Sequence, residues 1–243
     1  MMRRWLPPLL WLALLLGASF AMERLEPLLR WLDPDSRQLL YQRASLAALL
    51  GRHLLIVACA GGLAVLLGVT AGILVTRSWG RDFLPLASQV ASIGQTFPPV
   101  AVLALSVPLL GFGALPTIVA LLLYGLLPVL RNSLAGLQGV PPAVLEAARG
   151  MGMSPLRVLW QVELPLARPV ILAGVRTCLT LSIATAALGS TVGASTLGDP
   201  LIAGLVNGNN AYLLQGALLI GLLALCVDSL FGALSGPGPR SPG

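Results

Sequence analysis

Long apolar stretches alternate with short polar stretches along the whole chain. Six of the apolar runs are candidate membrane spans, because a helix needs about 20 apolar residues to cross a bilayer. The predicted spans are Trp5–Met22, Leu54–Val75, Leu84–Leu110, Leu115–Leu130, Val170–Val192 and Leu213–Leu230. The pattern therefore predicts an all-α integral membrane protein with about six transmembrane helices.

The first apolar run has two possible roles. It follows Arg3 and Arg4, and Ser19-Phe20-Ala21 partly matches the small-residue site at which signal peptides are cleaved. Nothing downstream resembles a secreted domain. We therefore expect residues 1–22 to be retained as an N-terminal transmembrane helix that acts as a signal anchor.

The polar stretches divide the rest of the chain. Residues 23–53 are of mixed charge and are expected to form an extracytoplasmic segment with a short interfacial helix near Leu28–Leu32. Residues 54–234 form the membrane domain, which includes a polar loop at residues 132–169. The tail, residues 235–243, consists mostly of Pro, Gly and Ser and is expected to be disordered.

Prolines and glycines mark special positions inside the apolar runs. The third run is interrupted at Gly94–Pro99, where two prolines remove backbone donors and favour a break. A broken helix at membrane depth is tolerated only where protein or water satisfies the freed groups, so this region is a candidate translocation pathway. Gly68 and Gly72, like Gly189 and Gly193, stand four residues apart, which predicts faces that another helix approaches closely.

Composition excludes several classes of function. The chain is 56% hydrophobic and 10% charged, whereas soluble domains have about 25% charged residues. All fifteen basic residues are Arg, so the Lys that a phosphate-binding P-loop requires is missing, and we expect no ATP hydrolysis by that route. The net charge is +6, but the Arg residues form no patch with interleaved aromatics, which argues against nucleic acid as a partner.

The sequence predicts neither a metal site nor a bound cofactor. Cys59, Cys178 and Cys226 lie in or beside apolar runs and are expected to behave as small buried hydrophobes. His53 is the one histidine and begins a span, so we expect it to have a structural, interfacial role rather than to bind a metal.

The arginines also predict the orientation of the chain, because cytoplasmic flanks carry the excess of positive charge. With the N-terminus inside, ten arginines face the cytoplasm, and only five, all between residues 24 and 52, lie outside. Both termini and the polar loop are therefore predicted to be cytoplasmic.

The polar loop is predicted to contain two short helices. Pro141-Pro142 can open the first helix, and Gly150 and Gly152 close it. Ser154-Pro155 supplies an N-cap and a first residue for the second helix, which we expect Pro165 to end. The predicted apolar side of this pair consists of Val144, Ala148, Met151, Leu156, Leu159 and Trp160. Such short helices need a partner, which is either another protein or the membrane surface.

The loop also carries a family signature. Glu146-Ala147-Ala148, then Gly152, then Leu164-Pro165 resembles the cytoplasmic signature of the permease subunits of bacterial ABC importers. The resemblance extends to permeases of the osmoprotectant type, which carry glycine betaine, choline or carnitine. It is carried by Gly94–Pro99, Pro108–Gly113, Tyr124–Pro128, Met151–Ser154, Glu163–Ala167, Ala173–Thr177 and Gly193–Gly198. The chain departs from the family pattern at Phe97-Pro98-Pro99 and Ser195-Thr196, where relatives more often have Ile-Pro-Ser and Gly-Gly.

The resemblance implies a type I importer permease fold in the bacterial inner membrane, with a loop that couples it to a separate ATPase. The coupling residues would be Glu146, Ala147, Ala148, Gly152, Leu164 and Pro165. It also implies an ATPase dimer, a second permease that is identical or paralogous, and an extracytoplasmic binding protein as partners. We expect the binding protein to be a separate polypeptide.

Several residues are candidates for the transport path, although helix packing explains them equally well. These are Gln95, Thr96, Phe97, Pro98, Ser190 and Thr191. Arg176 either pairs with Glu163 or extends to the cytoplasmic interface. Gly198-Asp199-Pro200 either contacts the binding protein or simply forms a turn.

Three other functions are possible. An importer of another small solute, such as an amino acid, would show the same loop. An ion-coupled carrier usually places Asp, Glu or His inside the bilayer, and no predicted span has one at its middle. A subunit that only anchors a complex would not need the broken third span.

Overall fold

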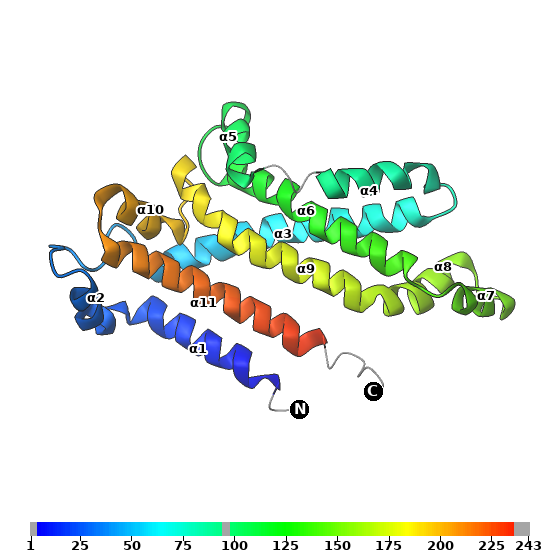
Figure 1. The fold of residues 1–243 in the computed structure, drawn as a ribbon, viewed down its shortest axis with the longest axis horizontal. Helices are drawn as coiled ribbons and strands as arrows, with labels where there is room; N and C mark the ends of the chain where they lie inside the picture. Colours follow the sequence, from blue (N-terminus) through cyan, green and yellow to red (C-terminus); the bar gives the residue numbers. More distant parts are fainter. Residues whose placement is uncertain (1–3, 94–97, 236–243) are drawn as a thin grey trace. The chain divides into compact units, whose positions relative to one another are not determined.

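The structure is a computed structural model that describes residues 4–93 and 98–235, and every regular element in these residues is helical. Figure 1 shows these helices in order along the chain. The α-helices are α1 (Leu6–Phe20), α2 (Glu26–Leu32), α3 (Leu46–Thr76), α4 (Leu84–Ile93), α5 (Pro99–Leu110), α6 (Ala114–Gln138), α7 (Pro142–Gly150), α8 (Pro155–Val158), α9 (Leu164–Ala186), α10 (Gly198–Asn207) and α11 (Asn210–Ser235). Short 3₁₀ turns are η2 (Met22–Leu25), η3 (Arg81–Phe83) and η6 (Ala187–Val192), and η5 (Leu159–Glu163) is a π-helical turn.

The chain forms two compact units. The first contains residues 1–60, 99–121 and 179–243, and the second contains residues 61–98 and 122–178. The first unit therefore includes the first and last described helices, α1 and α11, whereas the second includes the polar loop.

Four of the described helical segments are long and apolar enough to cross a membrane. They are Leu46–Thr76, Ala114–Gln138, Pro155–Val192 and Asn210–Leu234. Leu6–Phe20 and Met22–Leu32 pass the same test only as a pair bent by 90°, which gives up to five spans. The predicted third span is present as two shorter helices, because α4 ends at Ile93 and α5 begins at Pro99. The prediction of a short helix near Leu28–Leu32 is confirmed by α2.

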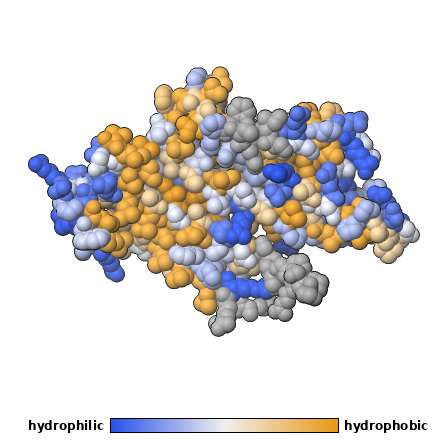
Figure 2. Space-filling model, in the orientation of Figure 1, coloured by the Kyte–Doolittle hydropathy of each residue, from blue (hydrophilic) through white to orange (hydrophobic). Residues whose placement is uncertain are grey.

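The first unit is held together by an apolar core. In this unit α1 and α10 both pack against α11. The core contains Leu15, Leu49, Ile56, Leu121, Ile183, Leu197 and Leu219, together with neighbouring small and aliphatic side chains. The outer faces of the same helices remain apolar, as with Leu9 and Leu55. Figure 2 shows this as broad orange surfaces, with hydrophilic side chains gathered around α2 at the left. Exposed apolar faces are what lipid-facing helices require.

His53 joins three segments of the first unit. Its side chain is fully buried, and its Nε2 lies 3.1 Å from the carbonyl oxygen of Ile183 in α9. The backbone N–H of Leu197 donates to its Nδ1 at 3.3 Å. Both ring nitrogens therefore have partners in the neutral form, in which Nε2 carries the proton and donates to the carbonyl. This geometry supports the predicted structural role.

The irregular segment before α3 is tied to the first turns of α11. Asp33 Oδ2 accepts the backbone N–H of Asn210 at 2.8 Å and that of Ala211 at 3.4 Å. The buried Gln215 donates to the carbonyl of Leu39 at 2.6 Å and accepts the N–H of Tyr41 at 3.2 Å. A carboxylate at the start of a helix satisfies free amides and interacts favourably with the helix dipole. These bonds fix residues 33–41 against α11.

Glycines allow the helices of the second unit to approach closely. A Cβ placed on Gly72 of α3 would lie 2.7 Å from Cβ of Ser133 in α6. A Cβ on Gly68 would lie 2.9 Å from Cγ1 of Val129 in the same helix, and 3.1 Å from the backbone nitrogen of Leu130. The prediction that Gly68 and Gly72 form a close-approach face is confirmed, and the partner is α6.

The second predicted glycine pair works differently. A Cβ on Gly189 would lie 2.6 Å from Cγ2 of Thr117, so Gly189 does allow a close contact. Gly193 instead adopts a left-handed φ of 82° at the end of η6. The chain leaves the α-helix after Ala186, so the two glycines do not share one helical face. The prediction of a shared face at Gly189 and Gly193 is therefore wrong.

We expect Gly72→Ala to destabilise the protein because its new methyl group overlaps Ser133. Overpacking of this kind typically costs about 1–3 kcal/mol. Gly62→Ala in the same helix is the matched control, because no atom lies within 4 Å of the added Cβ. Unfolding of the detergent-solubilised variants, followed by tryptophan fluorescence, measures the difference. Equal midpoints for the two variants would contradict the close contact.

We also expect acid to weaken the anchor at Asp33. Its pKa lies below the ordinary value of 3.8, mainly because Ser36 donates a hydrogen bond, while burial opposes the shift and the amides of Asn210 and Ala211 add to it. The stabilisation is therefore present above pH 3.8 and is lost as the pH falls through the lower folded pKa. The difference in unfolding free energy between the unsubstituted protein and Asp33→Asn should narrow from pH 7 to pH 3. Asp35→Asn on the same segment is the control, and a difference that does not change with pH would refute the anchor.

Candidate functional site

The polar loop folds into α7 and α8, which lie at the end of α6 and the start of α9 (Figure 1). Pro141 is the N-cap of α7 and Pro142 its first residue, where a missing N–H costs nothing. Ser154 caps α8 by accepting the N–H of Arg157 at 3.4 Å, and Pro155 is the first residue of that helix. The predicted starts of both helices are therefore confirmed.

Gly152 makes the turn between the two helices. Its φ of +81° lies in the left-handed region, which strains any residue with a side chain. The N–H of Gly152 donates to the carbonyl of Arg149 at 2.9 Å, and the N–H of Met153 donates to that of Ala148 at 3.2 Å. These two bonds define a Schellman motif, in which the residue after the helix is usually glycine. The glycine of the signature is thus required by backbone conformation, since no neighbouring atom crowds it.

The prediction that Pro165 ends the second helix is wrong. The chain stays helical from α8 through the π-helical turn η5 into α9, and Pro165 is the second residue of α9. In a regular α-helix the proline ring would clash with the carbonyl four residues earlier. A π-helical turn contains one extra residue and changes the local hydrogen bonding. We attribute the tolerance of Pro165 to this wider turn.

The helices on both sides reach further into the loop than the sequence indicated. Residues 132–138 belong to α6, and residues 164–169 belong to α9. Leu164 packs beside the buried Leu137 and Leu159, whereas Pro165 is exposed. The segment between the two long helices is therefore compact.

The two faces of the loop differ in exposure. Ala148 is only 2% exposed and Leu159 only 8%, so both pack inside the second unit. The exposed side carries Val144, Glu146, Ala147, Met151, Leu156 and Trp160. These six exposed residues are a candidate surface for contact with another protein, and we call them the docking surface. The predicted apolar side is thus divided. Ala148 and Leu159 pack against the second unit, whereas the other four residues, Val144, Met151, Leu156 and Trp160, are exposed.

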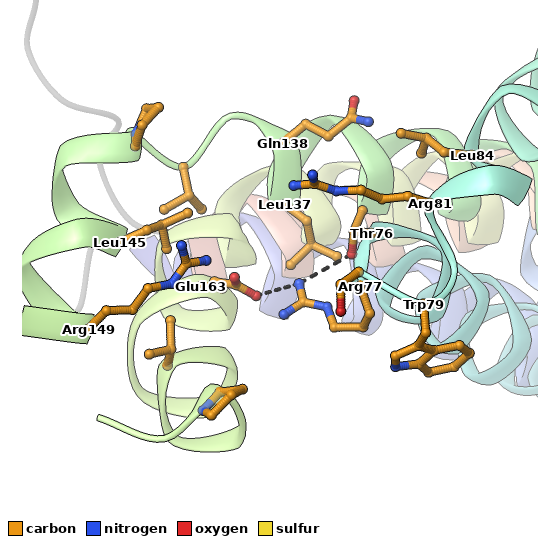
Figure 3. A pocket seen from close by; sticks show the side chains of 15 residues that line it. Thr76, Arg77, Trp79, Arg81, Leu84, Leu137, Gln138, Leu145, Arg149 and Glu163 are labelled. Carbon is orange, nitrogen blue, oxygen red and sulfur yellow. Dashed lines mark hydrogen bonds and ion pairs between the residues drawn. The ribbon is translucent and has the colours of Figure 1, made fainter. Parts of the chain in front are cut away.

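A cavity of about 840 Å³ lies between the loop and the ends of α3 and α6. Figure 3 shows Arg77, Arg81, Arg149 and Glu163 among the side chains that line it. Glu163 is the one acidic side chain among these lining residues. The cavity wall is therefore strongly basic.

Glu163 forms an ion pair with Arg77 at the end of α3. Their atoms Oε2 and Nη2 lie 2.5 Å apart, and the Glu163 side chain is 8% exposed. The alternative partner suggested by the sequence, Arg176, is thirteen residues further along the same helical run, or about 20 Å at 1.5 Å per residue. That distance excludes a direct pair with Glu163. In the sequence, Arg77 contributes only to the predicted cytoplasmic excess of positive charge, and no residue pattern indicates its pair with Glu163.

The pathway candidates are only partly described. Gln95, Thr96 and Phe97 lie outside the described residues, and Pro98 is exposed and non-helical. Ser190 lines a cavity of about 370 Å³ in the first unit, together with Tyr41, Arg43 and Asp199. Thr191 is exposed next to it and donates to the carbonyl of Leu188 at 2.7 Å.

Asp199 organises the wall of this smaller cavity. Its Oδ1 accepts the hydroxyl of Ser190 at 2.5 Å and the N–H of Thr196 at 3.3 Å. Gly198-Asp199-Pro200 forms the first turn of α10. A Cβ on Gly198 would lie 2.0 Å from the carbonyl oxygen of Ala187, so this position needs glycine. The three residues therefore have a structural explanation within the chain.

Known relatives resemble the chain along most of its length. It is 41% identical over 179 residues to the osmoprotectant import permease OsmY of Salmonella typhimurium, covering 74% of this chain and 76% of that protein. It is 37% identical over 201 residues to the choline transport permease OpuBB of Bacillus subtilis, covering 83% and 88%.

A solved structure shows the same fold. An inward-facing structure of the MetNI methionine ABC transporter contains a chain that matches with a TM-score of 0.68 and 21% identity, covering 78% of this chain and 94% of that one. The fold is therefore that of an ABC importer permease.

A family model matches most of the membrane domain. The model describes binding-protein-dependent transport system inner membrane components, and the match covers residues 64–236. This range includes both α7 and α8 with the Gly152 turn between them. The chain belongs to the family of inner membrane components of binding-protein-dependent transport systems.

Proposed function

We propose that the chain is the permease subunit of an ATP-driven type I importer for small osmoprotectants such as glycine betaine, choline and carnitine. It forms part of the transport path and leaves ATP hydrolysis to a separate ATPase dimer. A second permease, identical or paralogous, and an extracytoplasmic binding protein complete the assembly.

The docking surface, which lies on α7, α8, the turn between them and η5, carries this proposal. Met151 is 76% exposed and Trp160 is 64% exposed, beside the exposed Glu146 and Ala147. Large apolar side chains beside a charged group are typical of a surface that another protein covers. The helices beneath are held by the Gly152 turn and by Ala148, Leu159 and Leu164. The surface is therefore rigid enough to move as one piece with α9.

The proposed substrate class rests on the relatives, which are named for transport of osmoprotectants and choline. Aromatic side chains are the best ligands for a quaternary ammonium group, but they make up only 5% of this chain. We therefore assign most of the selectivity to the binding protein. Ser190 and Thr191, with Gln95, Thr96, Phe97 and Pro98, remain our candidates for the path itself.

The proposed topology has six crossings with both termini in the cytoplasm. It counts α1 as a crossing and assigns one further crossing to α4 and α5 together. The docking surface and residues 77–83 then face the ATPase, and residues 33–43 face the binding protein. The distribution of arginines supports this orientation.

The function is tested by uptake of labelled solutes at high osmolarity. Cells that lack their own osmoprotectant importers should take up glycine betaine, choline or carnitine when this chain and its partners are expressed. Glu146→Lys should lower that uptake tenfold or more, which corresponds to about 1.4 kcal/mol of docking free energy. Glu23→Lys, an exposed carboxylate on the opposite side of the proposed topology, is the control. Uptake of labelled methionine but of none of these osmoprotectants would contradict the proposed substrate class. Normal uptake by the Glu146→Lys variant would refute the proposed docking role of this surface.

The turn at Gly152 gives an independent test of the docking surface. Gly152→Ala must hold an alanine at φ +81°, which costs about 1–2 kcal/mol. Gly152→Asn should retain more activity, because asparagine tolerates this conformation. Gly150→Ala, two residues away and without any crowding atom, should behave like the unsubstituted protein. We expect uptake to fall in the order Gly150→Ala, Gly152→Asn, Gly152→Ala at equal protein abundance. Any other ranking would show that the left-handed turn is not needed for coupling.

A further inference from the structure

Arg77 and Glu163 form an ion pair, although they lie 86 positions apart in the sequence. The Arg77 side chain is 23% exposed and that of Glu163 is 8% exposed. Bringing two charges out of water is costly, and an ion pair of this kind is often no more stabilising than apolar residues of the same size. A contribution to stability therefore does not explain why this ion pair is present, and its position between two helical segments has to be explained in another way.

Arg77 is fixed to the last turn of α3. Its Nε donates to the carbonyl of Ile73 at 3.3 Å, and its Nη2 donates to Oγ1 of Thr76 at 3.2 Å. That hydroxyl in turn donates to the carbonyls of Gly72 and Ile73 at 3.0 and 2.9 Å. The guanidinium group therefore moves with α3, although arginine is a long side chain.

Glu163, the other member of the ion pair, is also held in place by its backbone. It is the last residue of the π-helical turn, and helix continues on both sides of it. Val158, the last residue of α8, is buried against the unit only five positions earlier. A displacement of α8 is therefore passed to the carboxylate without an intervening flexible loop.

We propose that the Arg77–Glu163 pair is a strut that couples the docking helices to α3 and stays intact during the transport cycle. Arg77 is thus a positioning residue for coupling, and the inference deepens the proposed function on which it rests. A movement of the ATPase that displaces α8 would move α9 directly and α3 through this pair. Because α3 also contacts α6 at Gly68 and Gly72, the strut closes a triangle of helices in the second unit.

The test measures solute uptake and ATP hydrolysis in the same vesicles, with the complete complex of permease, ATPase and binding protein. In Arg77→Gln and Glu163→Gln we expect the ATPase to remain bound but the amount of solute moved per ATP to fall about tenfold. The exchanged pair, Arg77→Glu with Glu163→Arg, should recover at least half of the original ratio. Arg30→Gln and Glu26→Gln remove an exposed ion pair on α2 and should leave the ratio unchanged.

A second measurement separates coupling from folding. In a chain whose three cysteines are replaced by alanine, Arg77→Cys and Glu163→Cys would be joined by a short bismaleimide. The joined protein should recover coupling, whereas the same protein capped with N-ethylmaleimide should remain uncoupled. Both samples come from one purified polypeptide, so a folding defect would affect them equally.

Three outcomes would overturn the strut. They are loss of the bound ATPase from the single variants, an equal fall of uptake and hydrolysis, and failure of both the exchanged pair and the bismaleimide to recover coupling. A joined protein that binds ATPase but transports nothing would overturn the proposal as well, because it would show that the pair must open during the cycle. Failure of the proposed function would be seen separately, as a wild-type complex that neither assembles nor transports.

Discussion

The unbroken helix that leads from α8 through the π-helical turn into α9 is the constraint on which the proposed mechanism depends. A docking surface can drive a membrane helix only if little motion is lost between them. Helical hydrogen bonds supply that stiffness along the backbone, and the wider turn accommodates Pro165, which would otherwise interrupt the helix. Hydrogen bonds within the loop cap both short helices. The Schellman bonds around Gly152 cap the end of α7, and Ser154 caps the start of α8.

Glycine has two distinct roles in this protein, and they predict different responses to substitution. Gly68 and Gly72 are ordinary helical residues whose missing side chains let α6 lie close to α3. Gly152 has open space around it and is needed only because its backbone is left-handed. A methyl group therefore causes overlap at the first two positions and backbone strain at the third.

Several buried or partly buried polar side chains connect segments distant in sequence. His53 joins α3 to α9 and to the turn before α10, and Gln215 joins α11 to residues 39–41. Arg77 and Glu163 do the same in the second unit. Since buried polar groups cost free energy unless they are paired, each of these groups allows few alternative arrangements. Polar contacts thus define geometry in a chain whose apolar packing alone is less specific.

The amino-acid sequence was sufficient to predict an all-helical membrane protein and the starts of the two short loop helices at Pro142 and Pro155. The signals for these features act locally: hydrophobic runs of membrane length, prolines at helix starts and a glycine after a helix. The same local reasoning failed at Pro165, because a π-helical turn depends on hydrogen bonds that no residue pattern displays. It also failed at Gly189 and Gly193, where the spacing matched a helix that ends at Ala186. The partner of Glu163 was decided only by tertiary structure. A charge identifies which residues can pair, but only the packing of the end of α3 beside η5 brings Arg77 within reach of Glu163.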